Sequence, residues 1–593
     1  MKSQTTALWF VLAVALGGFI WIFEHHFQPA PPPVSGLLAG LRAADITSLQ
    51  VIPAGTREIS ARRTNGTWQL EKPVAYPAQA AAIETLLATL EKLSPALRLT
   101  AGELHGRKNA DAEFGFENPR FSIVAEAGDE RWQLLVGNPT APGDQVYVRV
   151  VGVDGVFITD PAWLARLPRT ANDWRDTALA TAAGDCDWII ITNGIKTIEL
   201  RCDPTNHLWR MTRPLLARAD GQRIAAALQQ LRAAQVTQFV SDDPKADLAA
   251  YGLQPAELDV RLGHGTNLVA AVHAGKNSPE NPDRIFARRE GWNSVVTVAK
   301  DALTLWRGAV NDFRDAHLLE LSTPAGEIEM RGENGFTLQR RGTNDWSLAG
   351  EKISADAGIV QAFLKLLAGF RTVEFVKDLN TGADLQGFGL TTPARQIILR
   401  AIPGDTNSAL AQLLFGASET NRIFVKRADE DYVYALAMAD YNRLPENGWE
   451  FRDRRVWNFN TNDVTQLTLR QNGKTRQLVR DAAGKWSLAP GSQGVFDGRW
   501  MEMIVRQFGE MTAAGWVARN FTAPEKFGFT PDGYQIVIEL KDGKKLAVDF
   551  GTELPSQAGL AAVTLDGERW AFVCPASLYQ FAKLYLVIPP NTP

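Results

Sequence analysis

Three arginines at equivalent places along the chain are the most suggestive groups for binding chemistry. Arg175, Arg314 and Arg452 each follow an acidic and an aromatic residue and precede an aspartate, for example as Asp-Trp-Arg-Asp at 173–176. A guanidinium binds carboxylate or phosphate through two parallel hydrogen bonds, so the series could bind a repeated anionic ligand such as a glycan or phosphate. It could also pair with carboxylates and hold one structural unit against the next. Each arginine ends a unit and the last unit lacks it, which favours the structural interpretation.

The three cysteines are a second group with chemical potential. Cys186 and Cys202 flank a predicted hairpin that turns at Asn193-Gly194, and Cys574 stands alone. A pairing centred on residue 194 would place Cys186 opposite Cys202, and an oxidising compartment would then permit a disulfide. The alternative is two unpaired strand cysteines, because one residue of register slip would separate them.

The remaining reactive residue types lie in patterns that favour structural roles. Gly473-Lys474-Thr475 lacks the earlier glycine of a phosphate-binding loop, because Thr468 holds that position. The seven histidines form no His-Glu-x-x-His motif, and no serine lies in a Gly-x-Ser-x-Gly elbow. His25 and His26 could bind metal weakly, but two solvated histidines are the simpler interpretation. We therefore predict no catalytic residue, no metal site and no cofactor.

These residues belong to a unit that repeats four times along 593 residues. An aromatic residue, a glycine, an apolar residue and a nearby proline recur, and successive glycines are 137, 137 and 139 residues apart. Such a glycine ends a helix in the left-handed conformation, and the proline then starts an extended segment. A turn glycine and a tryptophan recur at the same period. The landmarks are Gly115, Gly252, Gly389 and Gly528, and Trp68, Trp209, Trp346 and Trp486.

Each unit is predicted to follow the order ββ-α-ββββ-α. Two strands meet at the turn glycine, and the tryptophan ends the second strand. An amphipathic helix follows, whose buried face in the first unit runs from Ile83 to Leu90. Short connections favour antiparallel sheets, so the fold class is α+β. The predicted N-caps of three of these helices are Asp220, Asp356 and Asp497.

The N-terminal segment has a different character from the repeats. Residues 7–23 form an uncharged apolar run, close to the length that spans a bilayer. We predict an uncleaved transmembrane anchor rather than a cleaved signal peptide, with Lys2 in the cytoplasm and the repeats outside. A Pro-rich spacer follows. The predicted segments are a cytoplasmic stub at 1–6, the anchor at 7–23, the spacer at 24–37, and repeat units at 38–180, 181–320, 321–460 and 461–593.

Composition limits the classes of partner. The formal net charge is −4, charged residues make up 22% of the chain, and the two signs are well mixed. This distribution argues against a nucleic-acid groove and against a polybasic membrane surface. Apolar residues make up 45% of the chain, including 17 Trp and 28 Phe, so each unit can bury a core of its own.

The anchor, the tryptophan hairpin, the Tyr/Phe-Gly-Leu-x-Pro signature and the closing aromatic-Arg-Asp together resemble an uncharacterised bacterial family, the domain of unknown function 4340. The resemblance covers the chain after Gly36. It implies a single-anchor envelope protein whose gene often neighbours an ABC transporter of the gliding-motility type, and it implies no catalytic residue. The first unit departs by having Gly-Phe for Gly-Leu, and the fourth by lacking the Arg-Asp ending.

These features lead to an expectation about function. We expect a non-catalytic binding or scaffold protein in the inner membrane, single-pass and mostly periplasmic, accessory to an ABC-type permease and ATPase. One alternative is an envelope-side enzyme that acts on a polymer at a site between repeats, which a deep cleft with converging carboxylates or histidines would favour. Another alternative is a structural spacer or adhesin.

Overall fold

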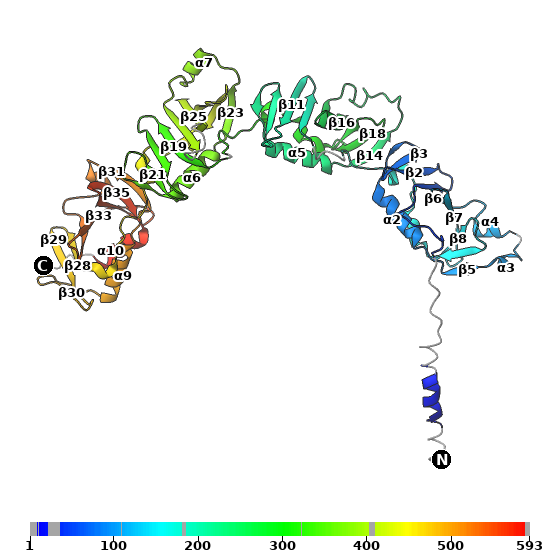
Figure 1. The fold of residues 1–593 in the computed structure, drawn as a ribbon, viewed down its shortest axis with the longest axis horizontal. Helices are drawn as coiled ribbons and strands as arrows, with labels where there is room; N and C mark the ends of the chain where they lie inside the picture. Colours follow the sequence, from blue (N-terminus) through cyan, green and yellow to red (C-terminus); the bar gives the residue numbers. More distant parts are fainter. Residues whose placement is uncertain are drawn as a thin grey trace. The chain divides into compact units, whose positions relative to one another are not determined.

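Four antiparallel sheets dominate the computed structural model (Figure 1). The structure describes residues 9, 11–19, 21, 36–107, 109–180, 186–321, 323–401 and 409–586. The chain divides into two compact units, Met1–Asp315 and Ala316–Pro593. Each of these units contains two of the repeats, so the predicted α+β class with a repeated antiparallel sheet is confirmed.

The first compact unit holds two nine-stranded sheets with the same strand order. They run β4-β3-β2-β1-β6-β7-β8-β9-β5 and β13-β12-β11-β10-β15-β16-β17-β18-β14. Repeat 1 consists of β1 (Ser48–Pro53), β2 (Ile59–Thr64), β3 (Thr67–Lys72), β4 (Tyr76–Pro77), α2 (Ala80–Glu91), β5 (Leu97–Leu99), α3 (Ala101–Leu104), α4 (Ala110–Phe114), β6 (Phe121–Ala127), β7 (Glu130–Pro139), β8 (Val146–Val150), β9 (Val156–Thr159), η1 (Pro161–Arg166) and η2 (Ala171–Asp173). Repeat 2 consists of β10 (Trp188–Asn193), β11 (Lys196–Cys202), β12 (Trp209–Arg213), β13 (Ala217–Arg218), α5 (Gly221–Ala233), β14 (Val236–Ser241), β15 (Leu258–His264), β16 (Asn267–Asn277), β17 (Arg284–Arg289), β18 (Val295–Ala299), η3 (Lys300–Leu303), η4 (Leu305–Arg307) and η5 (Val310–Phe313).

The second compact unit repeats this plan, with one strand fewer in its last sheet. The orders are β22-β21-β20-β19-β24-β25-β26-β27-β23 and β30-β29-β28-β32-β33-β34-β35-β31. Repeat 3 consists of β19 (Ala325–Arg331), β20 (Phe336–Arg340), β21 (Trp346–Leu348), β22 (Ser354–Ala355), α6 (Ala357–Ala368), β23 (Thr372–Lys377), α7 (Gly382–Gly387), β24 (Arg395–Ala401), β25 (Ala409–Ser418), β26 (Arg422–Arg427), β27 (Val433–Ala437), α8 (Met438–Tyr441) and η6 (Gly448–Phe451). Repeat 4 consists of η7 (Thr461–Asp463), β28 (Val464–Gln471), β29 (Lys474–Arg480), β30 (Trp486–Leu488), α9 (Gly498–Gly509), β31 (Gly515–Arg519), η8 (Pro524–Phe527), β32 (Tyr534–Leu540), β33 (Lys545–Glu553), β34 (Gly559–Leu565), β35 (Glu568–Cys574) and α10 (Ala576–Tyr585).

The predicted order ββ-α-ββββ-α is wrong in four details. The landmark tryptophan opens a third strand rather than ending the second, and repeats 1–3 add a fourth strand of two residues before the helix. A further strand follows the helix and pairs at the far edge of the sheet. The closing helix is a set of 3-10 turns or a four-residue helix in repeats 1–3 and an α-helix only as α10. Strands of two or three residues are too short to show the alternation that marks a strand in sequence.

The main helix of each repeat covers one face of its sheet. In α2 the residues predicted to face inward, Ile83, Leu86, Leu87 and Leu90, are all buried. Asp220, Asp356 and Asp497 accept hydrogen bonds from backbone amides in the first turn, as predicted for N-caps. The landmark tryptophans Trp68, Trp346 and Trp486 are buried, and Trp209 is half-buried against the core of repeat 2.

Each signature glycine ends a turn in the left-handed conformation, as predicted. Around Gly252, the glycine amide donates to Ala249 O at 3.0 Å, and the amide of Leu253 donates to Leu248 O at 2.8 Å. These two bonds form a Schellman motif. The φ angles of Gly115, Gly252, Gly389 and Gly528 are 80°, 71°, 67° and 81°.

The prediction that the signature glycine ends a helix is wrong at Gly252, because the segment before this glycine forms turns. The Asp243 carboxylate accepts the Lys245 amide at 2.9 Å, and the Asp247 carboxylate accepts the Ala249 amide at 3.1 Å. Such local side-chain bonds give the backbone an alternative to helix. The glycine stop forms without the helix.

The signature segment packs on the sheet face opposite the main helix. In β17, Ile285 belongs to the core beneath α5, whereas the next residue, Phe286, packs with Leu253 and Val295. Successive strand residues point to opposite faces, so the two clusters lie on the two sides of one sheet. The signature segment lies close to β16 because residue 275 of that strand is a glycine. A Cβ at Gly275 would lie 2.1 Å from Tyr251 O.

The N-terminal predictions are only partly covered by the described residues. The stub 1–6 lies outside them, as do several residues of the anchor 7–23, His25, His26 and the spacer up to residue 35. Within the residues that are described, no helix is both long and apolar enough to cross a membrane.

Candidate functional site

The closing segments at 173–176, 312–315 and 450–453 complete the edge of their own sheets. Ala78, Ala219 and Ala355 bridge to Arg175, Arg314 and Arg452 respectively. The following aspartate amide donates back to the short edge strand, for example from Asp176 to Pro77 O at 2.9 Å. The recurring motif therefore acts first as a strand that covers an exposed sheet edge.

The acidic residue of each closing segment caps the adjacent turn. Asp173 Oδ2 accepts the amides of Arg169 and Thr170, both at 2.8 Å. Glu450 Oε1 accepts the amides of Glu446 and Asn447 at 2.9 and 2.8 Å. These carboxylates satisfy backbone donors that the turn leaves unpaired.

Arg175 joins repeat 1 to repeat 2. Its side chain is 1% exposed, and its Nη2 lies 2.5 Å from Asp242 Oδ1 of repeat 2. The guanidinium lies over Tyr76 of repeat 1 at 4.9 Å and over Phe239 of repeat 2 at 4.1 Å from the ring centroids. Ser294 supports the contact by donating to Asp242 Oδ1 at 2.7 Å. The arginine is thus held between two rings and a carboxylate, as the structural interpretation predicts.

A second arginine reinforces the same junction from the other side. Arg289 of repeat 2 donates to Asp176 Oδ2 at 3.3 Å and lies 5.7 Å from the Tyr76 ring. Trp292 packs on Tyr76 with ring centroids 5.3 Å apart. Tyr76 is largely removed from water, and this desolvation raises the pKa of its phenol.

Of the other two arginines, Arg314 is buried and Arg452 is half-buried. Arg452 lies 4.5 Å from the Trp570 ring and pairs with Asp566 at 3.2 Å, so it joins repeat 3 to repeat 4. The Trp516 indole N–H donates to Arg452 O at 3.1 Å. Arg314 is 2% exposed and donates to Asn311 Oδ1 at 3.2 Å. The series is therefore built into the protein rather than displayed to a solvent-borne anion.

The predicted opposition of Cys186 and Cys202 is wrong by one residue. The β10–β11 hairpin pairs Asn193 with Lys196, so Asp187 lies opposite Cys202, and the Cys202 amide donates to Asp187 O at 2.8 Å. Both cysteines are free thiols. Burial raises the pKa of the Cys186 thiol to about 11. The two-residue turn at Gly194-Ile195 decides this register, because Asn193 stays in the strand.

The Gly473-Lys474-Thr475 segment belongs to a hairpin that turns at Asn472-Gly473, as predicted. Gln471 pairs with Lys474, and Asn472 and Gly473 have φ angles of 51° and 74°. Positive φ at both central residues is the signature of a type I′ turn. This geometry leaves no loop that could surround a phosphate.

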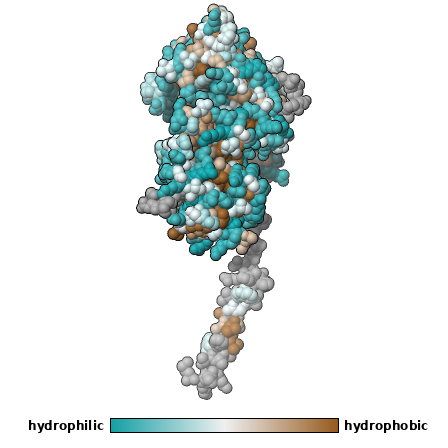
Figure 2. All heavy atoms as spheres, turned by 90° about the vertical axis from the view of Figure 1, so that its left-hand side faces the viewer, coloured by the Kyte–Doolittle hydropathy of each residue, from teal (hydrophilic) through white to brown (hydrophobic). Residues whose placement is uncertain are grey.

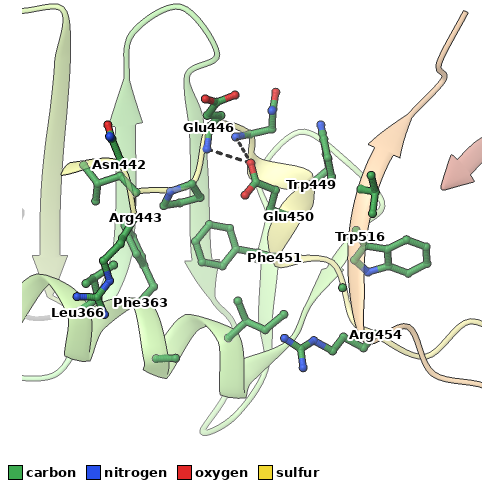
Figure 3. Close-up of a pocket in the computed structure, with 17 residues that line it drawn as sticks. Phe363, Leu366, Asn442, Arg443, Glu446, Trp449, Glu450, Phe451, Arg454 and Trp516 are labelled. Carbon is green, nitrogen blue, oxygen red and sulfur yellow. Dashed lines mark hydrogen bonds between the residues drawn. The ribbon is translucent and has the colours of Figure 1, made fainter. Parts of the chain in front are cut away.

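A cavity lies in the second compact unit, beside α6 (Figure 3). It has a volume of about 720 Å³. Its floor is the outer face of α6 with Phe363 and Leu366, one wall is the loop 442–447 with η6, and the other is the start of β31. We call it the repeat-3 groove. Sequence reasoning missed it, because its walls come from segments with no shared linear motif.

An equivalent cavity of about 640 Å³ lies beside α2 in repeat 1. Its lining includes Ala82, Leu167, Pro168 and Trp174, which correspond to Ile359, Leu444, Pro445 and Phe451 of the repeat-3 groove. The sequence signal for both is Arg-Leu-Pro at 166–168 and 443–445. Repeat 2 has Leu-Trp-Arg at that place instead.

Surface hydropathy offers no single broad apolar face in the view of Figure 2. Hydrophilic residues cover most of the visible face, and apolar residues form small separate patches. The described residues contain no cluster of three or more His, Cys, Asp or Glu side chains arranged to hold a metal ion.

One titratable cluster lies on the open face of the repeat 2 sheet. His273 Nε2 is 2.6 Å from Glu290 Oε2, and its Nδ1 is 3.2 Å from Asp259 Oδ2. The hydrogen bond to Asp259, followed by that to Glu290, raises the pKa of His273 against the opposing effect of burial. Arg261 also contacts Asp259, at 3.1 Å.

This cluster predicts a pH-dependent contribution to stability. The pKa of His273 is higher in the folded protein than in the unfolded chain, so protonated His273 stabilises the fold. This stabilisation is complete below the unfolded pKa of about 6.5 and is lost as pH rises through the pKa of the folded protein. We expect His273→Gln to destabilise repeat 2 by about 1–3 kcal/mol at pH 5, and by much less at high pH. Hydrogen exchange of β16 amides across this pH range measures the difference. A constant difference at every pH would contradict the prediction.

Comparison with known proteins identifies the family. A family model described as a domain of unknown function, DUF4340, matches residues 68–199, 209–382 and 346–531. These segments begin at the landmark tryptophans Trp68, Trp209 and Trp346.

Two further comparisons add little to this match. No curated protein matches the chain. A solved structure of a Ca²⁺-stabilized adhesin that helps an Antarctic bacterium bind ice matches 85% of this chain and 89% of its own, at 8% identity. Its TM-score of 0.07 carries no argument about fold or function. The matched segments together span most of the sequence, and the chain therefore belongs to the DUF4340 family.

Proposed function

We propose that this protein is a non-catalytic binding and scaffold subunit of an envelope complex, anchored in the inner membrane by residues 7–23. The observation that carries the proposal is the Arg175 junction, where a buried guanidinium joins two neighbouring repeats through two rings and a carboxylate. In a junction of this kind, the charged groups hold neighbouring folded repeats together. Repeats that are held together present a larger surface to a partner than one repeat alone.

The nature of the partner rests on the family. The resemblance to DUF4340 proteins implies a gene neighbourhood with ABC transporters of the gliding-motility type, so the proposed partners are a polytopic permease and its ATPase. The apolar run 7–23 and the Pro-rich spacer 24–37 are consistent with a protein tethered close to such a permease.

The enzymatic alternative would require converging reactive groups. In the repeat-3 groove the two carboxylates are Glu446 and Glu450, and one oxygen of Glu450 already accepts two backbone amides. An oxygen that already accepts two backbone amides has a structural role as the cap of the turn. This observation favours binding over hydrolysis at that groove.

Affinity purification of the full-length protein after gentle detergent extraction tests the proposal. We expect a permease and an ATPase to co-purify, and we expect a cytoplasm-only reporter fused after Pro593 to be silent. Recovery of the protein alone, with hydrolytic activity on envelope polymers that a point mutation removes, would contradict the scaffold role. An active reporter would reverse the proposed orientation.

A further inference from the structure

Repeat 2 fills its own version of the groove with an arginine. Arg223 of α5 extends along the closing turn and donates from Nη2 to Leu305 O at 3.3 Å. The same nitrogen lies 3.9 Å from Asp312 Oδ2, and the guanidinium lies 5.0 Å from the Phe313 ring. A Cβ at Gly308 would lie 2.5 Å from Nη2, so the guanidinium occupies the space that a side chain at 308 would need.

Repeat 3 offers the same surroundings without the arginine. Ile359 takes the place of Arg223, because each of these residues donates its amide to the N-cap aspartate of its helix. At the other equivalent positions, repeat 3 has Glu450 where repeat 2 has Asp312, Phe451 where it has Phe313, and Glu446 where it has Gly308. The groove therefore keeps the carboxylate and the aromatic ring that lie beside the guanidinium in repeat 2, and it adds a second carboxylate.

The two carboxylates of the repeat-3 groove are available to a ligand. Glu450 uses Oε1 for the two backbone amides, and Glu446 is exposed. Across the ranges that the structure describes, neither carboxylate forms a salt bridge. Of the two arginines in the lining, Arg443 lies 3.3 Å from Asp440. Figure 3 shows the second, Arg454, on the far side of the groove below Trp516.

We propose that the repeat-3 groove binds an arginine side chain of an extended segment of a partner protein, with the guanidinium where Arg223 lies in repeat 2. This inference rests on the proposed function as a binding protein. The groove of about 720 Å³ is much larger than a guanidinium, and its apolar floor of Ile359, Phe363 and Leu366 accommodates apolar side chains next to the arginine. The partner is thus a peptide with an arginine between apolar residues.

Repeat 1 supplies an internal control for this assignment. At the position of Glu446 it has Arg169, and the lining of its groove also includes Arg166. Its acidic residue, Asp173, uses Oδ2 for two backbone amides. A cationic ligand would meet Arg169 where the repeat-3 groove offers the Glu446 carboxylate, so the repeat 1 groove is not a second site for the same ligand.

The test measures binding of acetyl-Leu-Arg-Leu-amide to the full-length protein in detergent by isothermal titration calorimetry. We expect Glu446→Arg, which copies Arg169, to weaken binding at least about tenfold through loss of one charge pair and gain of a repulsive charge. Ile359→Arg, which copies Arg223, should fill the groove and abolish binding. Ala82→Arg places the same residue in the repeat 1 groove and should leave binding unchanged.

Two peptide controls make the outcome decisive. Citrulline in place of arginine keeps the shape and removes the charge, so it should bind at least about tenfold more weakly. Equal binding of the citrulline peptide, stronger binding of a glutamate peptide, or unchanged binding by Glu446→Arg would overturn the inference. Absence of peptide binding with intact co-purification of the permease would overturn only this inference, whereas loss of co-purification by the wild-type protein would overturn the proposed function.

Discussion

Replacing Gly275 with alanine is expected to destabilise repeat 2 by about 3 kcal/mol or more. An added Cβ would lie 2.1 Å from Tyr251 O and 2.8 Å from the carbonyl of Gly252. Both neighbours are backbone atoms of the signature turn, so no side-chain rotation can relieve the overlap. Either β16 or the turn must move, and the hydrogen bond from the Lys276 amide to Tyr251 O at 3.0 Å would be lost.

Hydrogen–deuterium exchange of the full-length protein measures this effect locally, which matters because a chain of four repeats does not unfold in one step. Amides of β15 and β16 should exchange about a hundredfold faster or more. Gly221→Ala is the matched control in the same repeat. Its Cβ would meet only Trp209 at 3.9 Å at the start of α5, so we expect no loss of stability. Similar exchange in the two variants would refute the proposed close contact.

Replacing Arg175 with alanine is expected to cost about 2–3 kcal/mol at the junction of repeats 1 and 2. The variant loses the ion pair to Asp242 and the contacts with the Tyr76 and Phe239 rings. The cost of about 3–5 kcal/mol that applies when a partner charge stays buried is too high here. The Asp242 side chain is 39% exposed, so water can solvate it after the arginine is removed.

The change should appear in the strands that meet at the junction rather than throughout each repeat. We expect faster amide exchange in β14 and β18, with little change in β6 and β7. Arg175→Lys retains the charge but loses the planar group, and it should recover only part of the stability. Arg131→Ala is the control, because that side chain is 60% exposed and lies 3.8 Å from Glu126. A junction unaffected by Arg175→Ala would mean that Arg289 and the aromatic contacts suffice.

Together, the junction and the groove separate two uses of arginine in one chain. Arg175 and Arg452 join neighbouring repeats, whereas Arg223 fills a groove that repeat 3 leaves open. Repeat 4 lacks the closing segment, and a side chain replaces one of its hydrogen bonds. In repeats 1–3 the amide of the closing aspartate donates to a carbonyl two residues before the N-cap of the main helix. In repeat 4 the equivalent carbonyl, Val495 O, accepts the Arg476 guanidinium at 2.9 Å. Desolvation lowers the pKa of this buried arginine.

The sequence by itself determined the features that depend on local conformation. A glycine with positive φ, an aspartate at a helix start and apolar residues at helical spacing each follow from a few neighbouring residues. For this reason the four signature stops, the N-caps Asp220, Asp356 and Asp497 and the buried face of α2 were all predictable. The period of the repeat followed from the same landmarks.

The tertiary structure decided the features that depend on which distant segments meet. The two-residue strands form only because a neighbouring strand and the closing segment pair with them, so no sequence pattern marks them. The cysteine register depended on a single residue of turn geometry. Asp242, the partner of Arg175, lies 67 residues away in another repeat, and the repeat-3 groove combines a helix, a loop and an edge strand. Such contacts arise from packing between whole elements, whose side chains must first be placed by the fold.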